Sequence, residues 1–313
     1  MMKLSYINTR GLSCFEACCV TIANSLQLNY RISFLYSLSQ LRKQNTASPL
    51  LGARFELEEK FIFLYMELLT GMKAIEVAGL SEDNSLELIK SCMRLQKPVI
   101  LSFDIFYCPW STAFQKSHYL HNVIVTEYLG QKKGLICQDP MLKQTALLPL
   151  RLFVQACHSF YIVTTVQPEE FAYEDILRLS VGVLTKRDYF NSLQSFYTEF
   201  SLLKDMSDEY QNLNGDYWSC SLFRILSYGI PGARMLYGQF LEEIGSRLGQ
   251  EISEIGKGFA DLSTAWINLS GLILKLHYLG TYQRNKSRVC QQMQAILLNE
   301  MRLLQSLRSK VVT

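Results

Sequence analysis

The stretch PVILSFD, residues 98–104, is a short apolar run that begins with a proline, a pattern typical of a buried strand. A second strand is predicted at residues 121–128, HNVIVTEY, and a third at residues 135–139, LICQD. The segment GQKKG, residues 130–134, predicts the hairpin turn that joins them. Residues 160–166 predict a fourth strand. These runs together predict an antiparallel sheet in the first half of the chain.

Helical periodicity accompanies these strands. Apolar residues recur with a helical period in residues 15–26, 57–69 and 84–95. Ser81 or Asp83 can cap the third of these helices. The first half of the chain therefore predicts an α+β fold, in which helices pack beside the antiparallel sheet.

After Pro168 the strand patterns stop, and almost the whole remaining sequence has a helical period. The strongest stretches are residues 236–248, 252–276 and 290–307, and the predicted breaks are Gly215, a turn at residues 229–232, and Gly280. We therefore predict two domains, an α+β domain at residues 1–167 and an all-α domain at residues 168–313.

The composition is that of a globular protein with a sizeable core. Hydrophobic residues make up 49% of the 313 residues and charged residues 19%. The formal net charge is only +3 and the basic residues are dispersed, so we expect no nucleic-acid partner. Residues 61–66 and 266–279 are too short or too interrupted to span a bilayer, and Lys3, Arg10 and Glu16 occupy the place of a signal-peptide core. We therefore expect a cytoplasmic protein with no membrane partner.

The nine cysteines are an odd number and show neither CxxC pairs nor a regular spacing. In a chain of this length they indicate reduced, mostly buried thiols. The close pairs Cys18–Cys19 and His118–His121 do not form a recognised set of zinc ligands. No metal or other cofactor is therefore predicted.

Three residues of the first domain predict one nucleophilic site. Cys14 lies at the N-terminus of the first predicted helix, where unpaired N–H groups and the helix dipole favour thiolate over thiol. His121 opens one predicted strand, and Asp139 ends the next. Antiparallel pairing brings these two strand ends together, where the carboxylate can hold the imidazole in the tautomer that a base needs. Pro140 restricts Asp139 to an extended backbone, which helps to fix it there.

Each of these residues alone is more often structural than catalytic, and Asp-Pro is a common turn sequence. Their order in a helix-strand-strand context favours the joint site. Cys18 and Cys19 fall one turn inside the helix and are predicted as core residues, whereas Cys108 is a loop thiol that could line the site. His118 is three residues from His121, so on a strand the two would face opposite sides, and we prefer His121 as the base.

An oxyanion hole is also expected at such a site. The backbone N–H of Cys14 is its natural first donor. Asn8, six residues earlier, could add a side-chain N–H, although an ordinary loop residue is the alternative.

The order Asn8, Cys14, His121 and Asp139 resembles that of papain-like cysteine enzymes, including the bacteriocin-processing peptidases of ABC exporters. Those enzymes place an amide side chain six residues before the nucleophile and follow it with His and Asp. The amide is usually glutamine, and this chain has Asn8 instead. The resemblance implies that residues 1–167 form a papain-like catalytic domain with a Cys-His-Asp triad. The helical domain at residues 168–313 would then cover the active site or bind substrate.

Further motifs extend across most of the chain. They are GLSCFEA at residues 11–17, the strand at 98–104, HYLHNVIV at 118–125, Asp139-Pro140, GARMLYGQFL at 232–241, and Trp266. This set resembles the butirosin biosynthesis protein H family, whose members join a papain-like N-terminal half to a helical C-terminal domain. Phe15 separates Cys14 from Glu16, which departs from that family's Cys-Glu start.

The second resemblance implies an acyltransferase of secondary-metabolite or antibiotic biosynthesis. Its partners would be an acyl carrier protein or another thioester donor, and a small-molecule amine acceptor. An acyl-enzyme thioester would form on Cys14, and His121 would deprotonate the amine. The expected pocket residues, for which ordinary packing is the alternative, are Phe103, Asp104, Tyr107, Trp110, Tyr119 and Arg234.

Two other interpretations stay open. One is a cysteine hydrolase, whether thioesterase, peptidase or cyclase, with the same three residues. The other is a non-catalytic binding protein on this scaffold. The long apolar helices of the second domain also allow a homodimer.

Overall fold

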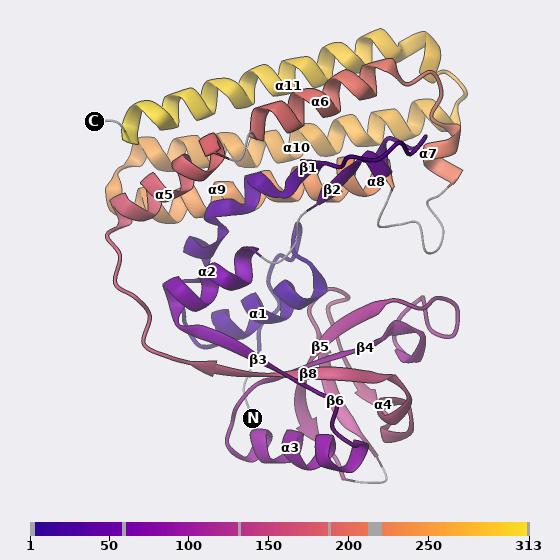
Figure 1. The fold of residues 1–313 in the computed structure, drawn as a ribbon, viewed down its shortest axis with the longest axis vertical. Helices are drawn as coiled ribbons and strands as arrows, with labels where there is room; N and C mark the ends of the chain where they lie inside the picture. The colour runs from indigo at the N-terminus through magenta and orange to yellow at the C-terminus, as the bar shows by residue number, and fades with distance from the viewer. Residues whose placement is uncertain (1–3, 58–60, 131–132, 187–188, 212–220, 312–313) are drawn as a thin grey trace. The chain divides into compact units, whose positions relative to one another are not determined.

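A computed structural model describes residues 4–57, 61–130, 133–186, 189–211 and 221–311 (Figure 1). The chain divides into two compact units, Met1–Tyr30 with Phe63–Glu169, and Arg31–Ile62 with Glu170–Thr313. The sequence pattern placed residues 31–62 in the N-terminal domain, whereas they cluster with the helical unit. The first unit has an α+β fold, and the C-terminal region after it is all-helical.

Six antiparallel strands form the sheet of the first unit, in the order β3-β8-β4-β5-β6-β7. Their bounds are β3 Met72–Ala78, β4 Val99–Asp104, β5 Leu120–Tyr128, β6 Leu135–Asp139, β7 Gln144–Leu148 and β8 Cys157–Thr165. The predicted strands β4, β5, β6 and β8 are confirmed, with their ends shifted by at most three residues. The edge strands β3 and β7 were not predicted, because most of their side chains are partly or fully exposed and carry no buried-strand pattern.

The two faces of this sheet are covered by different helices (Figure 1). Val123 and Val125 of β5 belong to a core shared with α3 (Glu82–Arg94) and α4 (Leu150–Ala156). Because side chains alternate along a strand, Asn122 and Ile124 face the other way. α1 (Cys14–Ser25) contacts β5 and packs Phe15 on Tyr161 of β8, with ring centroids 4.6 Å apart.

The predicted helices of this region are confirmed in the main. α1 and α3 match the predicted ranges to within two residues, and Ser81 caps α3 by accepting a hydrogen bond from the Asn84 N–H. α2 spans Phe61–Thr70, whereas the sequence predicted a start at residue 57. Leu57 ends a short strand instead. Within the residues that the structure describes, no helix anywhere in the chain is long and apolar enough to cross a membrane.

The regular elements of the C-terminal region are all helices within its described residues, as predicted. Its helices are α5 Tyr173–Lys186, α6 Tyr189–Leu202, α7 Ser207–Gln211, α8 Leu222–Arg224, α9 Ile230–Leu248, α10 Gln250–Tyr278 and α11 Tyr282–Val311. α9 and α10 approach closely where two glycines meet. A Cβ atom on Gly238 would lie 2.7 Å from the Gly256 carbonyl oxygen, so this crossing excludes larger residues.

The predicted turn at residues 229–232 is wrong. A π-helical segment, Ile225–Gly229, continues directly into α9. Pro231 lies in the first turn of α9, directly after this π-helical segment. Gly280, with a φ of 63°, does separate α10 from α11, and Gly215 lies outside the described residues.

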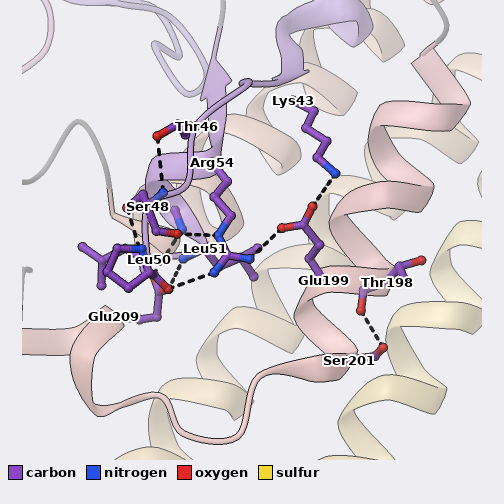
Figure 2. A network of polar contacts seen from close by, with 12 residues as sticks. Lys43, Thr46, Ser48, Leu50, Leu51, Arg54, Thr198, Glu199, Ser201 and Glu209 are labelled. Carbon is purple, nitrogen blue, oxygen red and sulfur yellow. Dashed lines mark hydrogen bonds and ion pairs between the residues drawn. The ribbon is translucent and has the colours of Figure 1, made fainter.

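Polar contacts explain why residues 41–57 cluster with the helices (Figure 2). This segment forms the hairpin of β1 (Leu41–Lys43) and β2 (Phe55–Leu57). Glu199 of α6 binds Lys43 at 2.6 Å and Arg54 at 3.0 Å. Glu209 of α7 accepts hydrogen bonds from the backbone N–H groups of Leu51 and Gly52.

Candidate active site

Cys14 is the first residue of α1 because the residue before it caps the helix. The Ser13 Oγ accepts a hydrogen bond from the Glu16 N–H at 3.3 Å, and Glu16 Oε2 accepts one from the Ser13 N–H at 2.9 Å. This reciprocal capping box fixes where the helix begins. The predicted position of Cys14 at a helix N-terminus is confirmed.

His121 and Asp139 come together where β5 begins and β6 ends. The strands pair antiparallel, with Ile124 opposite Gln138. The Nε2 of His121 lies 2.7 Å from Asp139 Oδ2, and the exposed fractions of these residues are 5% and 0%. The sequence spacing therefore located a buried imidazole–carboxylate pair.

Asp139 receives two further hydrogen bonds. The indole Nε1–H of Trp110 donates to Oδ2 at 3.0 Å, and the Leu142 N–H donates to Oδ1 at 3.0 Å. Three donors thus fix the carboxylate that orients His121. Trp110 was predicted to line a substrate pocket, but its polar atom is engaged with Asp139.

The Cys14 sulfur contacts two consecutive residues of β5. It is hydrogen-bonded to His121, and the Asn122 Nδ2–H donates to Sγ at 3.2 Å. Since Asp139 occupies Nε2 of His121, Nδ1 is the ring nitrogen that remains for Cys14. Asn122 is a site residue that sequence reasoning missed. Its signal was an amide inside a buried strand, directly after the predicted base.

The protonation equilibria of this group favour an ion pair. Burial raises the pKa of the Cys14 thiol, but the hydrogen bond and charge of His121, together with Asn122, outweigh burial and hold that pKa below its ordinary value. Burial lowers the pKa of His121, but Asp139 and Cys14 outweigh it and raise that pKa to about 9. Burial opposes ionisation of Asp139, yet the hydrogen bond from His121 keeps its pKa below the usual range. A thiolate beside an imidazolium is therefore the favoured state between the lowered pKa of Cys14 and the pKa of His121, about 9.

The other cysteines have the opposite character. Among the eight cysteines in the described residues, all free, Cys14 alone has a lowered pKa. Burial raises the pKa of Cys108 to about 12. Cys18 and Cys19 are fully enclosed core residues, as predicted, and burial raises both of their pKa values. Among the described cysteines, Cys14 is thus the thiol whose surroundings favour ionisation.

His118 differs from His121 in lying outside the strand, and not in facing the opposite side of it. It precedes the start of β5, so the alternation expected of a strand does not apply to it. Its Nδ1 lies 2.6 Å from Asp104 Oδ2, and its ring stacks on Phe106 with centroids 4.1 Å apart. Asp104, a predicted substrate-binding residue, therefore holds His118 in a separate pair.

The remaining predicted residues of this unit have different settings. The Tyr119 side chain is 53% exposed. Burial raises its pKa, with smaller contributions from the charges of Cys108, Cys14 and Asp139. Tyr107 is half-buried against the α3–α4 core. Asn8 is exposed, and its Oδ1 accepts a hydrogen bond from the Arg10 N–H at 3.2 Å.

Arg234, which was predicted to bind substrate, lies in the interior of the helical unit. Its guanidinium binds Glu300 of α11 at 2.9 Å and also donates to the Tyr189 hydroxyl. Both charged side chains are almost fully buried. Because its donors are used within the helical unit, we assign Arg234 a structural role.

The arrangement is that of an activated nucleophile, its base, and a carboxylate that orients the base. Across the described residues, no group of three or more His, Cys, Asp or Glu side chains could hold a metal ion. A comparison with models of known protein families finds no match, and neither does a comparison with curated proteins.

Proposed function

We propose that the protein is a cysteine-dependent acyltransferase with a papain-like catalytic domain. The observation that carries the proposal is the hydrogen-bonded series Cys14–His121–Asp139, in which the only thiol with a lowered pKa in the described chain meets a buried imidazole. A thiolate at a helix N-terminus is a strong nucleophile toward acyl carbon. The resemblance of several motifs to the butirosin biosynthesis protein H family favours amine acylation in a secondary-metabolite pathway.

The first half-reaction would load the enzyme. The Cys14 thiolate attacks the carbonyl carbon of a thioester on an acyl carrier protein or a small thiol. The tetrahedral intermediate then expels the donor thiolate, which takes the Nδ1 proton of His121. An acyl thioester on Cys14 and a free thiol result, and because one thioester replaces another the step is nearly isoenergetic.

The second half-reaction would transfer the acyl group to a small amine. The amine nitrogen attacks the Cys14 thioester, and the now neutral His121 accepts one of its protons. Collapse of the intermediate releases the amide and restores the thiolate–imidazolium pair. Amide formation is favourable and draws the sequence forward, provided that water does not reach the acyl-enzyme first.

Intact-protein mass spectrometry tests the proposal. The wild type is incubated with an acyl N-acetylcysteamine thioester, beside Cys14→Ala and, as a matched control, Cys290→Ala. Cys290 is partly exposed and lies on α11 in the helical unit, and burial raises its pKa. We expect an acyl adduct on the wild type and on Cys290→Ala, and none on Cys14→Ala.

Adding primary amines then identifies the reaction. An amide product formed at the expense of the adduct supports the transferase. Free acid at the same rate with and without amine would assign a hydrolase instead. If Cys14 gains no adduct and is alkylated no faster than the other thiols, the site is not catalytic and the binding-protein interpretation stands.

A further inference from the structure

Two buried amides interrupt the α1-facing side of the sheet. Asn122 of β5 and Gln138 of β6 are 4% and 5% exposed. Val123 and Cys137, which neighbour them in sequence, belong to the core on the opposite face. Both amides therefore lie on the side that packs against α1, which carries Cys14.

Each amide carries one buried polar atom that has no hydrogen-bond partner in the described residues. Asn122 uses Nδ2 to donate to Cys14 Sγ. Within the ranges that the structure describes, Asn122 Oδ1 and Gln138 Nε2 are buried and have no hydrogen-bond partner. One of these atoms is an acceptor and the other a donor, so each can satisfy the other. Buried polar groups without partners are uncommon and need a reason.

The strand register places the two amides as diagonal neighbours. Gln138 lies directly opposite Ile124, and Asn122 is two residues from Ile124 on the same face. Diagonal pairs on adjacent antiparallel strands lie about 7–8 Å apart, which long side chains can span. A turn of the Gln138 side chain, or one water molecule between the two amides, connects Nε2–H to Oδ1.

We propose that Asn122 is a catalytic residue that stabilises the Cys14 thiolate through Nδ2–H, and that Gln138 is the positioning residue that orients the Asn122 carboxamide for this role. An amide presents a donor at one end and an acceptor at the other. The opposite orientation would aim Oδ1 at the thiolate and repel it. By donating toward Oδ1, Gln138 selects the productive orientation.

This role deepens the proposed acyl transfer and rests on it for its catalytic meaning. A donor on sulfur lowers the free energy of the thiolate before it attacks the thioester. It also favours the release of thiolate when the tetrahedral intermediate of the second half-reaction collapses. This role differs from the oxyanion-hole role predicted for Asn8, because the Asn122 donor contacts the Cys14 sulfur.

The test is the pH dependence of Cys14 alkylation by iodoacetamide, followed by peptide mass mapping. It measures the thiolate without any acyl substrate. Asn122→Ala removes the donor, and Asn122→Asp keeps its shape if the alanine variant fails to fold. Gln138→Met keeps the length of the side chain without its N–H. Thr145→Val is the matched control, because Thr145 lies opposite Gln138 on β7 and is exposed.

At a pH below the thiol pKa, Asn122→Ala should alkylate about tenfold more slowly than wild type, one pKa unit in the profile. Asn122→Asp should be slower still, because it places an anion beside the thiolate. Gln138→Met should lower the rate of Cys14 alkylation about threefold, because it only weakens the orientation of the Asn122 amide and does not remove its donor. Thr145→Val should follow the wild-type profile.

An unchanged profile in a folded Asn122 variant would overturn the role of Asn122. A shift in the Asn122 variants without one in Gln138→Met would overturn the role of Gln138. If the profiles shift as expected while the wild type transfers no acyl group, the thiolate assignment holds and the proposed acyltransferase falls. The two failures are therefore distinguishable.

Discussion

Asp139→Asn isolates the charge that polarises His121. The carboxylate now accepts from His121 and Trp110 on Oδ2 and from the Leu142 N–H on Oδ1. An asparagine has a single acceptor oxygen. Placing that oxygen at the Oδ2 position keeps two of the three hydrogen bonds, and the reverse orientation keeps one. The variant should therefore retain the ring geometry of His121 and lose the negative charge beside it.

The magnitude follows from the pKa of His121, which is raised from 6.5 to about 9 mainly by Asp139 and then by Cys14. Complete loss of that increase is about 2.5 pKa units, or about 3.5 kcal/mol at roughly 1.4 kcal/mol per unit. Because Cys14 supplies part of it, we expect a smaller fall. The thiolate–imidazolium pair should become about 10²-fold less favourable relative to the neutral pair.

The assay is the rate of Cys14 alkylation by iodoacetamide across the pH range in which thiols and imidazoles titrate. The wild type should show two steps, the first below the ordinary thiol pKa and the second near the pKa of His121, about 9. Asp139→Asn should show one step, close to that of an ordinary thiol. If the variant retains both steps, Asp139 is not the cause of the ion pair and the proposed triad is wrong.

The pKa shifts of His121 and Asp139 also determine how the free energy of unfolding depends on pH. A raised pKa means that protonated His121 stabilises the fold fully below 6.5 and that this contribution is lost as the pH rises through about 9. The lowered pKa of Asp139 means that its contribution is present above 3.8 and is lost in acid. The free energies of unfolding of wild type and Asp139→Asn should therefore differ most between pH 3.8 and 6.5. The difference should vanish in acid, and it should shrink in part as the pH rises through about 9, because the contribution of Asp139 itself remains.

Three further substitutions test other contacts by urea unfolding. Trp110→Phe removes one donor to the Asp139 carboxylate and should lower the free energy of unfolding by about 1.5–3 kcal/mol near neutral pH. The loss should be smaller in acid, because that carboxylate becomes protonated. An equal loss at every pH would exclude this hydrogen bond as its cause. Ser13→Ala should cost about 1 kcal/mol through the lost helix cap, and no change would mean that the capping box is not formed. Arg234→Met should lower the free energy of unfolding by about 3–5 kcal/mol, because it leaves the buried Glu300 carboxylate without a charged partner. Adding Glu300→Leu should restore most of that loss. A double variant no more stable than the single one would contradict this explanation.

The sheet could be predicted wherever a strand is buried on both faces. Strand β4 has the sequence VILSFD, with five of six residues buried. An apolar run of this length after a proline is typical of a buried strand rather than of a helix. The edge strands could not be found in this way, because exposure to solvent removes the apolar pattern that marks a strand. Pro231 misled for a different reason: proline next to glycine is typical of a turn, but proline is equally suited to the first turn of a helix.

The site residues divide by how local their relationships are. His121 and Asp139 lie eighteen positions apart on one hairpin, so strand pairing alone brings them together. Cys14 could be singled out because a helix start can be recognised from its cap. The bond between Asn122 and Cys14 joins residues 108 positions apart and depends on how α1 packs on β5, for which neither segment carries a pattern. Trp110 likewise reaches Asp139 only through the path of a loop.

Arg234 and Asn122 show why a polar residue in an apolar segment must be judged by its partners. Both stand among buried neighbours, and both are almost completely enclosed. All the contacts of Arg234 are internal, and Glu300 balances its charge, so its burial is explained by the fold. Asn122 instead donates to Cys14, the one thiol among the described cysteines whose pKa is lowered. Its own Oδ1 has no hydrogen-bond partner in the described residues. A fold under selection for stability alone would replace such an amide with an aliphatic side chain, so its cost in free energy argues for chemistry at Cys14.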